Sequence, residues 1–107
     1  MNAERVLDAL GDPTRRRILK RLRGGRRSVA EIAGGLDVTR PAVSQHLQVL
    51  KGAGLVVARA DGTRRLYAVD PRGIMVVRNW LDGFWDETLT AFKMAAEREA
   101  AKEKKSR

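Results

Sequence analysis

The sequence predicts a mainly α-helical fold with a single β-hairpin placed before the last helix. Three observations support this prediction. Apolar residues recur three and four positions apart in five separate segments, which is the spacing of helices. Residues that commonly cap helices, such as Asp12, Ser28 and Thr39, stand at the boundaries of these segments. Two runs rich in β-branched residues flank Asp61-Gly62, a dipeptide typical of tight hairpin turns.

The first two helices are predicted over residues 3–10 and 13–23. Gly11 ends the first one. Asp12 and Pro13 then begin the second, as an N-cap carboxylate followed by proline in the first turn. The side chains that this second helix should bury are Ile18, Leu19 and Leu22.

The next two helices are predicted to be short and closely connected. Ser28 and Glu31 have the spacing of a capping box, which predicts a third helix over 28–36. Thr39 is the expected N-cap of a fourth helix within residues 39–54. Only about four residues connect them, so the pair resembles a helix-turn-helix.

The hairpin strands are predicted over residues 55–60 and 64–69, and Asp70-Pro71 then begins a long last helix. Two adjacent apolar stripes run along this helix, which is more apolar surface than one small domain needs. We expect a single domain over residues 1–96 and a polar, frayed tail over 97–107.

The charge of the chain favours a polyanionic partner. It carries 22 Lys and Arg against 13 Asp and Glu, a formal net charge of +9. Residues 1–70 hold 14 basic and 7 acidic side chains, so most of the excess lies there. Such an excess attracts nucleic acid or an anionic membrane surface. The chain has no apolar run of 18 residues and no signal-peptide pattern, so we expect it in the cytoplasm, without a membrane partner.

No catalytic or metal-binding pattern is found. Cysteine is absent, which excludes disulfides and thiolate metal sites. His46 is the only histidine, and it falls at the edge of the apolar arc of the fourth helix. We therefore interpret it as a packed histidine, with a catalytic base as the alternative. Asp82, Asp86 and Glu87 are interpreted as a solvated helix face. The sequence predicts no enzyme, no metal and no cofactor.

The fourth helix has a polar face without a carboxylate. Its apolar arc is predicted to contain Ala42, Val43, Leu47, Val49 and Leu50. The predicted DNA-binding residues are Thr39, Arg40, Ser44, Gln45, Gln48 and Lys51. Arginine pairs with guanine and glutamine with adenine from a helix in the major groove. The alternative is an ordinary solvated face, but such faces usually include Asp and Glu.

Basic residues of the hairpin and the second helix extend this hypothesis. The hairpin follows the fourth helix directly in the sequence, so it could lie beside a duplex that this helix contacts. It could then bind phosphates or the minor groove through Arg59, Thr63, Arg64 and Arg65. An arginine-rich turn that is merely solvated is the alternative. The second helix and the residues after it carry eight basic side chains, namely Arg15, Arg16, Arg17, Lys20, Arg21, Arg23, Arg26 and Arg27. Some could contact phosphates and others must point elsewhere, so no individual contact is predicted there.

Three segments resemble the ArsR/SmtB family of bacterial winged-helix repressors: LDALGDPTRRRILKRL, VAEIAGGLDVTRPAVSQHLQVLKGAGLV and RRLYAVDP. The resemblance covers residues 4–95 and implies a winged helix-turn-helix that dimerises through its first and last helices. It also implies that Arg40, Ser44 and Gln45 face the DNA. A bacterial cytoplasmic protein that joins the nucleoid when bound to DNA is the implied setting.

The chain departs from metal-sensing members of this family. Those proteins use cysteines in the third helix, or histidine and carboxylates in the last helix. Here the third helix has no cysteine and the last has no histidine, so no metal site is carried over. The chain is similar to a non-metal-sensing branch, and the identity of a small-molecule effector stays open.

The wide apolar face of the last helix predicts a homodimer. The expected interface residues are Val6, Leu7, Leu10, Trp80, Leu81, Phe84, Trp85, Thr88 and Phe92. The alternative is that these aromatic residues fill the core of one subunit. Two-fold symmetry would require a palindromic operator with half-sites about one helical turn apart.

Three functions remain in competition. The first is a dimeric, sequence-specific regulator that binds a palindromic operator, and the family resemblance implies that it is a repressor. The second is a nucleoid-associated protein that binds DNA by charge without sequence preference. The third is an RNA-binding protein, which is the weakest because the predicted binding face lacks aromatic side chains for stacking.

Overall fold

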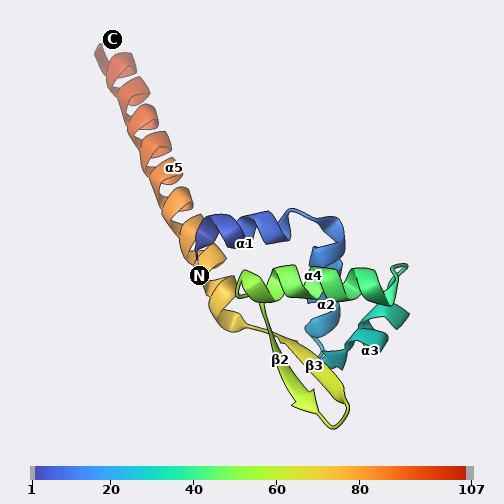
Figure 1. The fold of residues 1–107 in the computed structure, drawn as a ribbon. Helices are drawn as coiled ribbons and strands as arrows, with labels where there is room; N and C mark the ends of the chain where they lie inside the picture. The colour runs from blue at the N-terminus through green and yellow to red at the C-terminus, as the bar shows by residue number, and fades with distance from the viewer. Residues whose placement is uncertain (1, 106–107) are drawn as a thin grey trace. The chain divides into compact units, whose positions relative to one another are not determined.

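The computed structural model describes residues 2–105, and the chain divides after Val77 into two compact units. The described part of the first unit contains four helices, a three-stranded sheet and the start of a fifth helix. Figure 1 shows the helices and the hairpin formed by β2 and β3. Its elements are α1 (Ala3–Leu10), α2 (Pro13–Leu22), β1 (Arg27–Ser28), α3 (Val29–Gly34), α4 (Arg40–Gly52), β2 (Val56–Asp61) and β3 (Arg64–Val69). The last helix, α5, spans Pro71–Lys105 and enters the second unit. The predicted mainly α-helical fold with a hairpin wing is confirmed.

The helix boundaries follow from side chains that satisfy free backbone N–H groups. Asp12 accepts hydrogen bonds from the N–H groups of Thr14 and Arg15 at 2.8 and 3.2 Å. Ser28 and Glu31 form the predicted capping box, in which each side chain accepts a bond from the other's backbone N–H. The Thr39 hydroxyl accepts from the N–H of Ala42 at 3.3 Å, which sets where α4 begins.

The sheet contains one strand that the sequence did not reveal. The strand order is β1-β3-β2, and both pairings are antiparallel. The two-residue strand β1 pairs Arg27 with Tyr67. Such a short strand has no alternation of its own, so only its partner β3 makes it recognisable. In the hairpin turn Gly62 has φ of +62°, a conformation that glycine adopts without steric cost.

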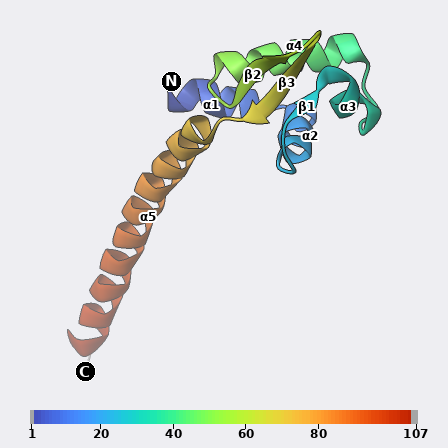
Figure 2. The same ribbon diagram turned by 90° about the horizontal axis from the view of Figure 1, so that it is seen from below.

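The core of the first unit joins α1, α2, α3 and α4 to the inner face of the sheet. Its fully buried large side chains are Val6, Ile18, Ile32, Val43, Leu47, Leu50, Leu55 and Val56. In Figure 1 α2 passes behind α4, and in Figure 2 it extends from α4 toward the bottom of the view. These two helices contact each other, and each has exposed residues on the side that faces away from the core.

Two sequence predictions about burial are wrong. Val6 was expected at a dimer interface, but it is fully buried in the core of its own unit. Val49 was placed on the apolar arc of α4, but its side chain is 46% exposed. Both errors arise because an ideal helical projection gives the direction of a side chain without telling what lies opposite it.

The start of α5 is fixed against the end of α4. Gly54, just after α4, has φ of +82°, and a Cβ atom on Gly73 would overlap its carbonyl group. This close approach requires glycine at position 73. Asp70 accepts a hydrogen bond from the N–H of Arg72 at 3.0 Å and also pairs with the Arg72 guanidinium. As predicted, Asp70 caps the helix.

The second unit is the remainder of α5. The helix is described through Lys105, so residues 97–105 are helical where the sequence predicted a frayed tail. Residues 106 and 107 of the expected tail lie outside the described residues. The rings of Trp80 and Phe84 stack with their centroids 5.7 Å apart. Within the described residues, no helix is both long and apolar enough to span a membrane.

Candidate DNA interface

The polar face of α4 is exposed, and most of its side chains have no internal partner in the described structure. Arg40, Gln45, Gln48 and Lys51 are exposed, and Ser44 is half-buried. Within residues 2–105 the side chains of these five residues form no hydrogen bond or ion pair. Val43, Leu47 and Leu50 bury the opposite face, so the core fixes the orientation of the polar one. Thr39 differs from the others, because its hydroxyl already caps the helix.

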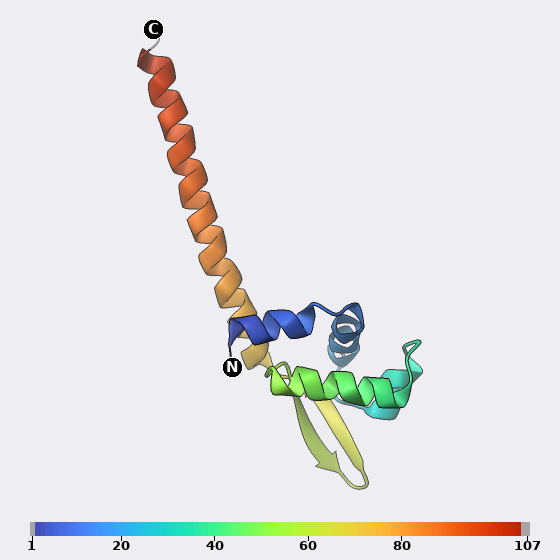
Figure 3. The same ribbon diagram turned by 45° about the horizontal axis from the view of Figure 1, so that its top comes forward.

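The helix α4 is held by α3 on one side and by the hairpin on the other. A short connection over residues 35–39 joins α3 to α4, and the two helices are in contact. Figure 3 shows β2 leaving the end of α4 and the hairpin running beneath that helix. This is the arrangement of a winged helix-turn-helix, in which helix and wing can face one duplex.

The wing arginines are not equivalent. Arg64 donates to Asp61 Oδ2 at 3.2 Å, and its other terminal nitrogen lies 3.6 Å from Glu31 Oε1 of α3. Arg59, Thr63 and Arg65 are exposed, and their side chains have no partner within the described residues. The two arginines that can reach a phosphate without breaking an internal contact are therefore Arg59 and Arg65.

Glu31 connects the start of α3 to the wing. The backbone N–H of Ser28 donates to its carboxylate, which is the main reason why the pKa of Glu31 is lowered from its usual value. The Ser28 hydroxyl and the positive charge of Arg64 lower it further, and partial desolvation opposes them. Glu31 thus stays ionised at neutral pH and can hold Arg64 in place.

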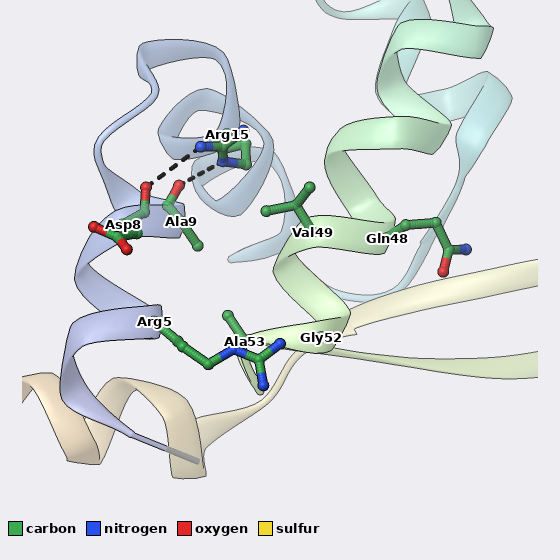
Figure 4. Close-up of a pocket in the computed structure, with 8 residues that line it drawn as sticks. All are labelled: Arg5, Asp8, Ala9, Arg15, Gln48, Val49, Gly52 and Ala53. Atoms are coloured by element: carbon green, nitrogen blue, oxygen red, sulfur yellow. Dashed lines mark hydrogen bonds between the residues drawn. The ribbon is translucent and has the colours of Figure 1, made fainter.

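His46 lies at the edge of the core, where the sequence placed it. It is half-buried, and its Nδ1 is 3.4 Å from Nη1 of Arg15. Figure 4 shows that Arg15 also donates to backbone carbonyls at the end of α1, to Ala9 at 2.6 Å and Asp8 at 3.3 Å. In residues 2–105 no group of three His, Cys, Asp or Glu side chains is placed to hold a metal ion.

A cavity of about 340 Å³ separates α1 from the second half of α4 (Figure 4). The α4 side is formed by Gln48, Val49, Gly52 and Ala53, and the opposite side by Arg5, Asp8, Ala9 and Arg15. This cavity explains why Val49 is exposed. Gln48 therefore borders both the cavity and the predicted DNA-binding face.

The expected dimer residues divide between the two units. In the first unit Leu7 and Leu10 are half-buried, and Leu10 packs against the core. In the second unit every expected residue of α5 is exposed, with Trp85 60% and Phe92 73% exposed. Aromatic side chains rarely remain so exposed in a functional assembly.

Comparisons with known proteins agree with this architecture. A helix-turn-helix domain family matches residues 10–59. The HTH-type transcriptional regulator Rv2034 of Mycobacterium tuberculosis is 52% identical over 89 residues, which cover 83% of each chain. The transcriptional repressor SdpR of Bacillus subtilis is 33% identical over 74% of this chain and 88% of its own.

A solved structure extends the similarity to the fold. It is the homodimeric winged helix-turn-helix DNA-binding domain Mb0332 from Mycobacterium bovis, described as a possible ArsR-family transcriptional regulator. It matches with a TM-score of 0.64 and 34% identity, over 78% of each chain. The fold, the exposed face of α4 and these relatives together show that the chain belongs to the ArsR/SmtB family of winged helix-turn-helix transcriptional regulators, which are not enzymes.

Proposed function

We propose that this chain is a homodimeric, sequence-specific repressor that binds a palindromic operator. The observation that carries the proposal is the polar face of α4. It is exposed, contains no carboxylate, and presents Arg40, Gln45 and Gln48 without internal partners in the described structure. A helix that only kept the protein soluble would not need a face composed of base-pairing side chains.

The residues fall into two roles. Arg40, Ser44, Gln45 and Gln48 contact base edges in the major groove, and Gln45 is nearest the centre of the exposed face. Lys51, Arg59 and Arg65 bind phosphates, with Thr39 and Thr63 as additional hydroxyl donors. Base contacts determine which sequence is bound, whereas phosphate contacts supply affinity for any duplex.

The dimer is supported by the exposed apolar face of α5. Trp80, Phe84, Trp85 and Phe92 lie on this helix in the second unit and are all exposed. A second copy of the same helix would bury them, with Leu7 and Leu10 of α1 contributing. The homodimeric relative Mb0332 has the same fold. Two α4 helices related by a two-fold axis would then contact half-sites about one helical turn apart.

Repression is supported by the relative SdpR, which is a transcriptional repressor. A dimer seated on an operator excludes other proteins from the same duplex, so binding alone is sufficient to repress. The competing function, charge-driven coating of DNA, would not need Gln45 or Gln48 on the exposed face.

The experiment compares binding to a preferred and an unrelated duplex for two variants. Gln45→Ala should reduce affinity for the preferred duplex by about 1–3 kcal/mol and leave the unrelated duplex unaffected. Arg65→Ala should weaken both duplexes equally and reduce the salt slope by about 1. If Gln45→Ala weakened both duplexes to the same extent, base contact by α4 would be wrong.

A further inference from the structure

The structure separates the basic residues of α2 and the following loop into two groups. Four of them donate to backbone carbonyl oxygens inside the first unit. The donors and acceptors are Arg15 to Ala9, Arg16 to Leu10, Arg21 to Glu31 and Arg27 to Arg21, at 2.6, 2.7, 3.0 and 2.9 Å. These guanidinium groups hold α1, α3 and β1 against α2. Their presence in the sequence is explained without any partner molecule.

Four other cations, namely Arg17, Lys20, Arg23 and Arg26, have no such explanation. They are exposed, and within the described residues their side chains form no hydrogen bond or ion pair. Arg26 lies in the loop after the helix. Arg17, Lys20 and Arg23 are spaced three residues apart, so they form one stripe along about 9 Å of helix. No acidic residue occurs between Pro13 and Ala30, so nothing on α2 neutralises the stripe. We name these three residues the α2 stripe.

The α2 stripe faces away from α4. The helix α2 packs into the core through Ile18, Leu19 and Leu22, and the stripe lies on its opposite side. The two helices are in contact, and Arg15 of α2 lies 3.4 Å from His46 of α4. The side of α2 that carries Arg15 therefore faces α4, and the stripe projects from the other side of the helix. A duplex held on the outer face of α4 is therefore out of reach of the stripe.

The composition of the stripe favours a phosphate backbone over a protein surface. Its three members are all positively charged and exposed. Stable protein interfaces bury apolar side chains, aromatic ones above all, and the stripe offers none. A row of cations without an apolar centre is complementary to the regular charges of a duplex.

We infer that the α2 stripe binds the phosphate backbone of a second DNA duplex, so that the protein bridges two DNA segments. Contact is made by Arg17, Lys20 and Arg23 through charge, independently of base sequence. Each copy of the stripe contributes about 3 to the salt slope for the second duplex, at about 0.9 per phosphate contact. The bridge uses the DNA bound by α4 under the proposed function, but the stripe is a separate surface.

The test is a two-duplex capture experiment with the full chain. One duplex of about 20 base pairs, two helical turns, is fixed to beads, and a second carries a fluorophore. The fluorescent duplex should be retained on the beads only when protein is present, and less as salt rises. In Arg17→Gln/Lys20→Gln/Arg23→Gln, retention should fall about tenfold while the affinity for one free duplex stays unchanged.

Two variants control for net charge and for folding. Lys93→Gln/Arg98→Gln/Lys104→Gln removes the same charge from exposed positions of α5 and should retain the second duplex normally. Arg17→Lys/Arg23→Lys keeps the charge and should also retain it, because a phosphate contact needs charge more than a forked donor. Thermal unfolding followed by circular dichroism establishes that each variant is folded.

Four outcomes would overturn the inference. The wild-type protein could fail to retain the second duplex. The stripe variant could still retain it, which would mean that two α4 helices hold separate duplexes. The stripe variant could instead lose affinity for a single duplex, which would mean that the stripe contacts the same duplex as α4. Equal loss of duplex retention in the stripe variant and the α5 variant would mean that net charge alone explains the effect.

The sequence preference of Gln45→Ala bears only on the proposed function. The proposed function and the inference about the α2 stripe can therefore fail separately.

Discussion

Nη1 of Arg15 lies 3.4 Å from Nδ1 of His46, and the same guanidinium donates to the backbone carbonyl of Ala9. One side chain of α2 therefore connects the helix predicted to contact DNA to the end of α1. Arginine can only donate, so a hydrogen bond between these two groups uses the Nδ1 lone pair of His46 as its acceptor. The only histidine of the chain thus has a structural partner that accounts for its place at the edge of the core.

Removing Arg15 should destabilise the first unit. Its side chain is 18% exposed and supplies charged hydrogen bonds to the carbonyl end of α1. Arg15→Ala should lower the free energy of unfolding by about 1–3 kcal/mol, measured by urea denaturation. Arg17→Ala is the matched control, since Arg17 has no internal partner in the described structure, and it should change stability by less than about 0.5 kcal/mol. Equal effects of the two changes would show that the carbonyl contacts contribute nothing.

The wing arginines should differ in their effect on DNA affinity. Arg64 must leave Glu31 or Asp61 before it can bind a phosphate, whereas Arg65 is free to bind at once. Arg65→Ala should therefore reduce the salt slope by about 1, and Arg64→Ala should reduce it by less. Fluorescence anisotropy across a salt series measures both slopes. A larger reduction for Arg64→Ala would mean that its ion pairs are lost when DNA binds.

Truncating an aromatic side chain of α5 should weaken the dimer. Trp85→Ala removes a large apolar side chain from the predicted interface and should cost about 2 kcal/mol, a roughly 30-fold weaker association. Thr90→Ala is the control, because Thr90 is also exposed but lies on the side of the helix opposite to the expected interface residues. Sedimentation equilibrium measures both constants. If Thr90→Ala weakened the dimer as much as Trp85→Ala, the interface would be on another face.

Acid should destabilise the fold through its capping carboxylates. The folded-state pKa of Glu31 is lowered mainly by the N–H of Ser28, and that of Asp12 mainly by the N–H of Arg15. A lowered folded-state pKa means that the ionised group stabilises the fold above its unfolded pKa. This stabilisation disappears as the pH falls below the unfolded-state pKa and through the lowered folded-state pKa.

Glu31→Gln tests this pH dependence. Glutamine retains the capping hydrogen bond but cannot ionise, so the variant should be less stable at neutral pH and lose less stability in acid. Denaturant unfolding at a series of pH values provides the measurement. Glu97→Gln, an exposed change in α5, should leave the profile as it is. A Glu31→Gln profile parallel to that of the wild type would contradict the assignment.

Local signals predicted most of the fold. Asp12, Ser28, Glu31 and Thr39 fix helix boundaries through bonds to neighbours within three residues, so the sequence contains both partners. The exposed positions of α4 followed in the same way from helical spacing. The exposed apolar surface of the last helix was also predictable, because this surface exceeds what one core can bury.

Contacts between distant residues could not be predicted. The partner of Arg64 in α3, Glu31, is 33 positions away in sequence, and the pairing depends on how the hairpin lies beside that helix. Which of the α2 arginines donate hydrogen bonds to backbone carbonyl groups also depends on the tertiary fold, because the fold determines which carbonyl groups lie near them. Val49 is exposed because a cavity separates α4 from α1, and no pattern in α4 indicates that cavity. Each of these features is a property of packing between elements.

Selection from random duplex DNA decides whether a dimer contacts specific bases through α4. Purified full-length protein is incubated with the pool at physiological salt, and the bound molecules are sequenced. We expect a palindromic motif whose half-sites are about one helical turn apart, and loss of that motif in Gln45→Ala. A bound pool with no enriched motif would mean that α4 recognises no base sequence, and would leave charge alone as the basis of DNA binding.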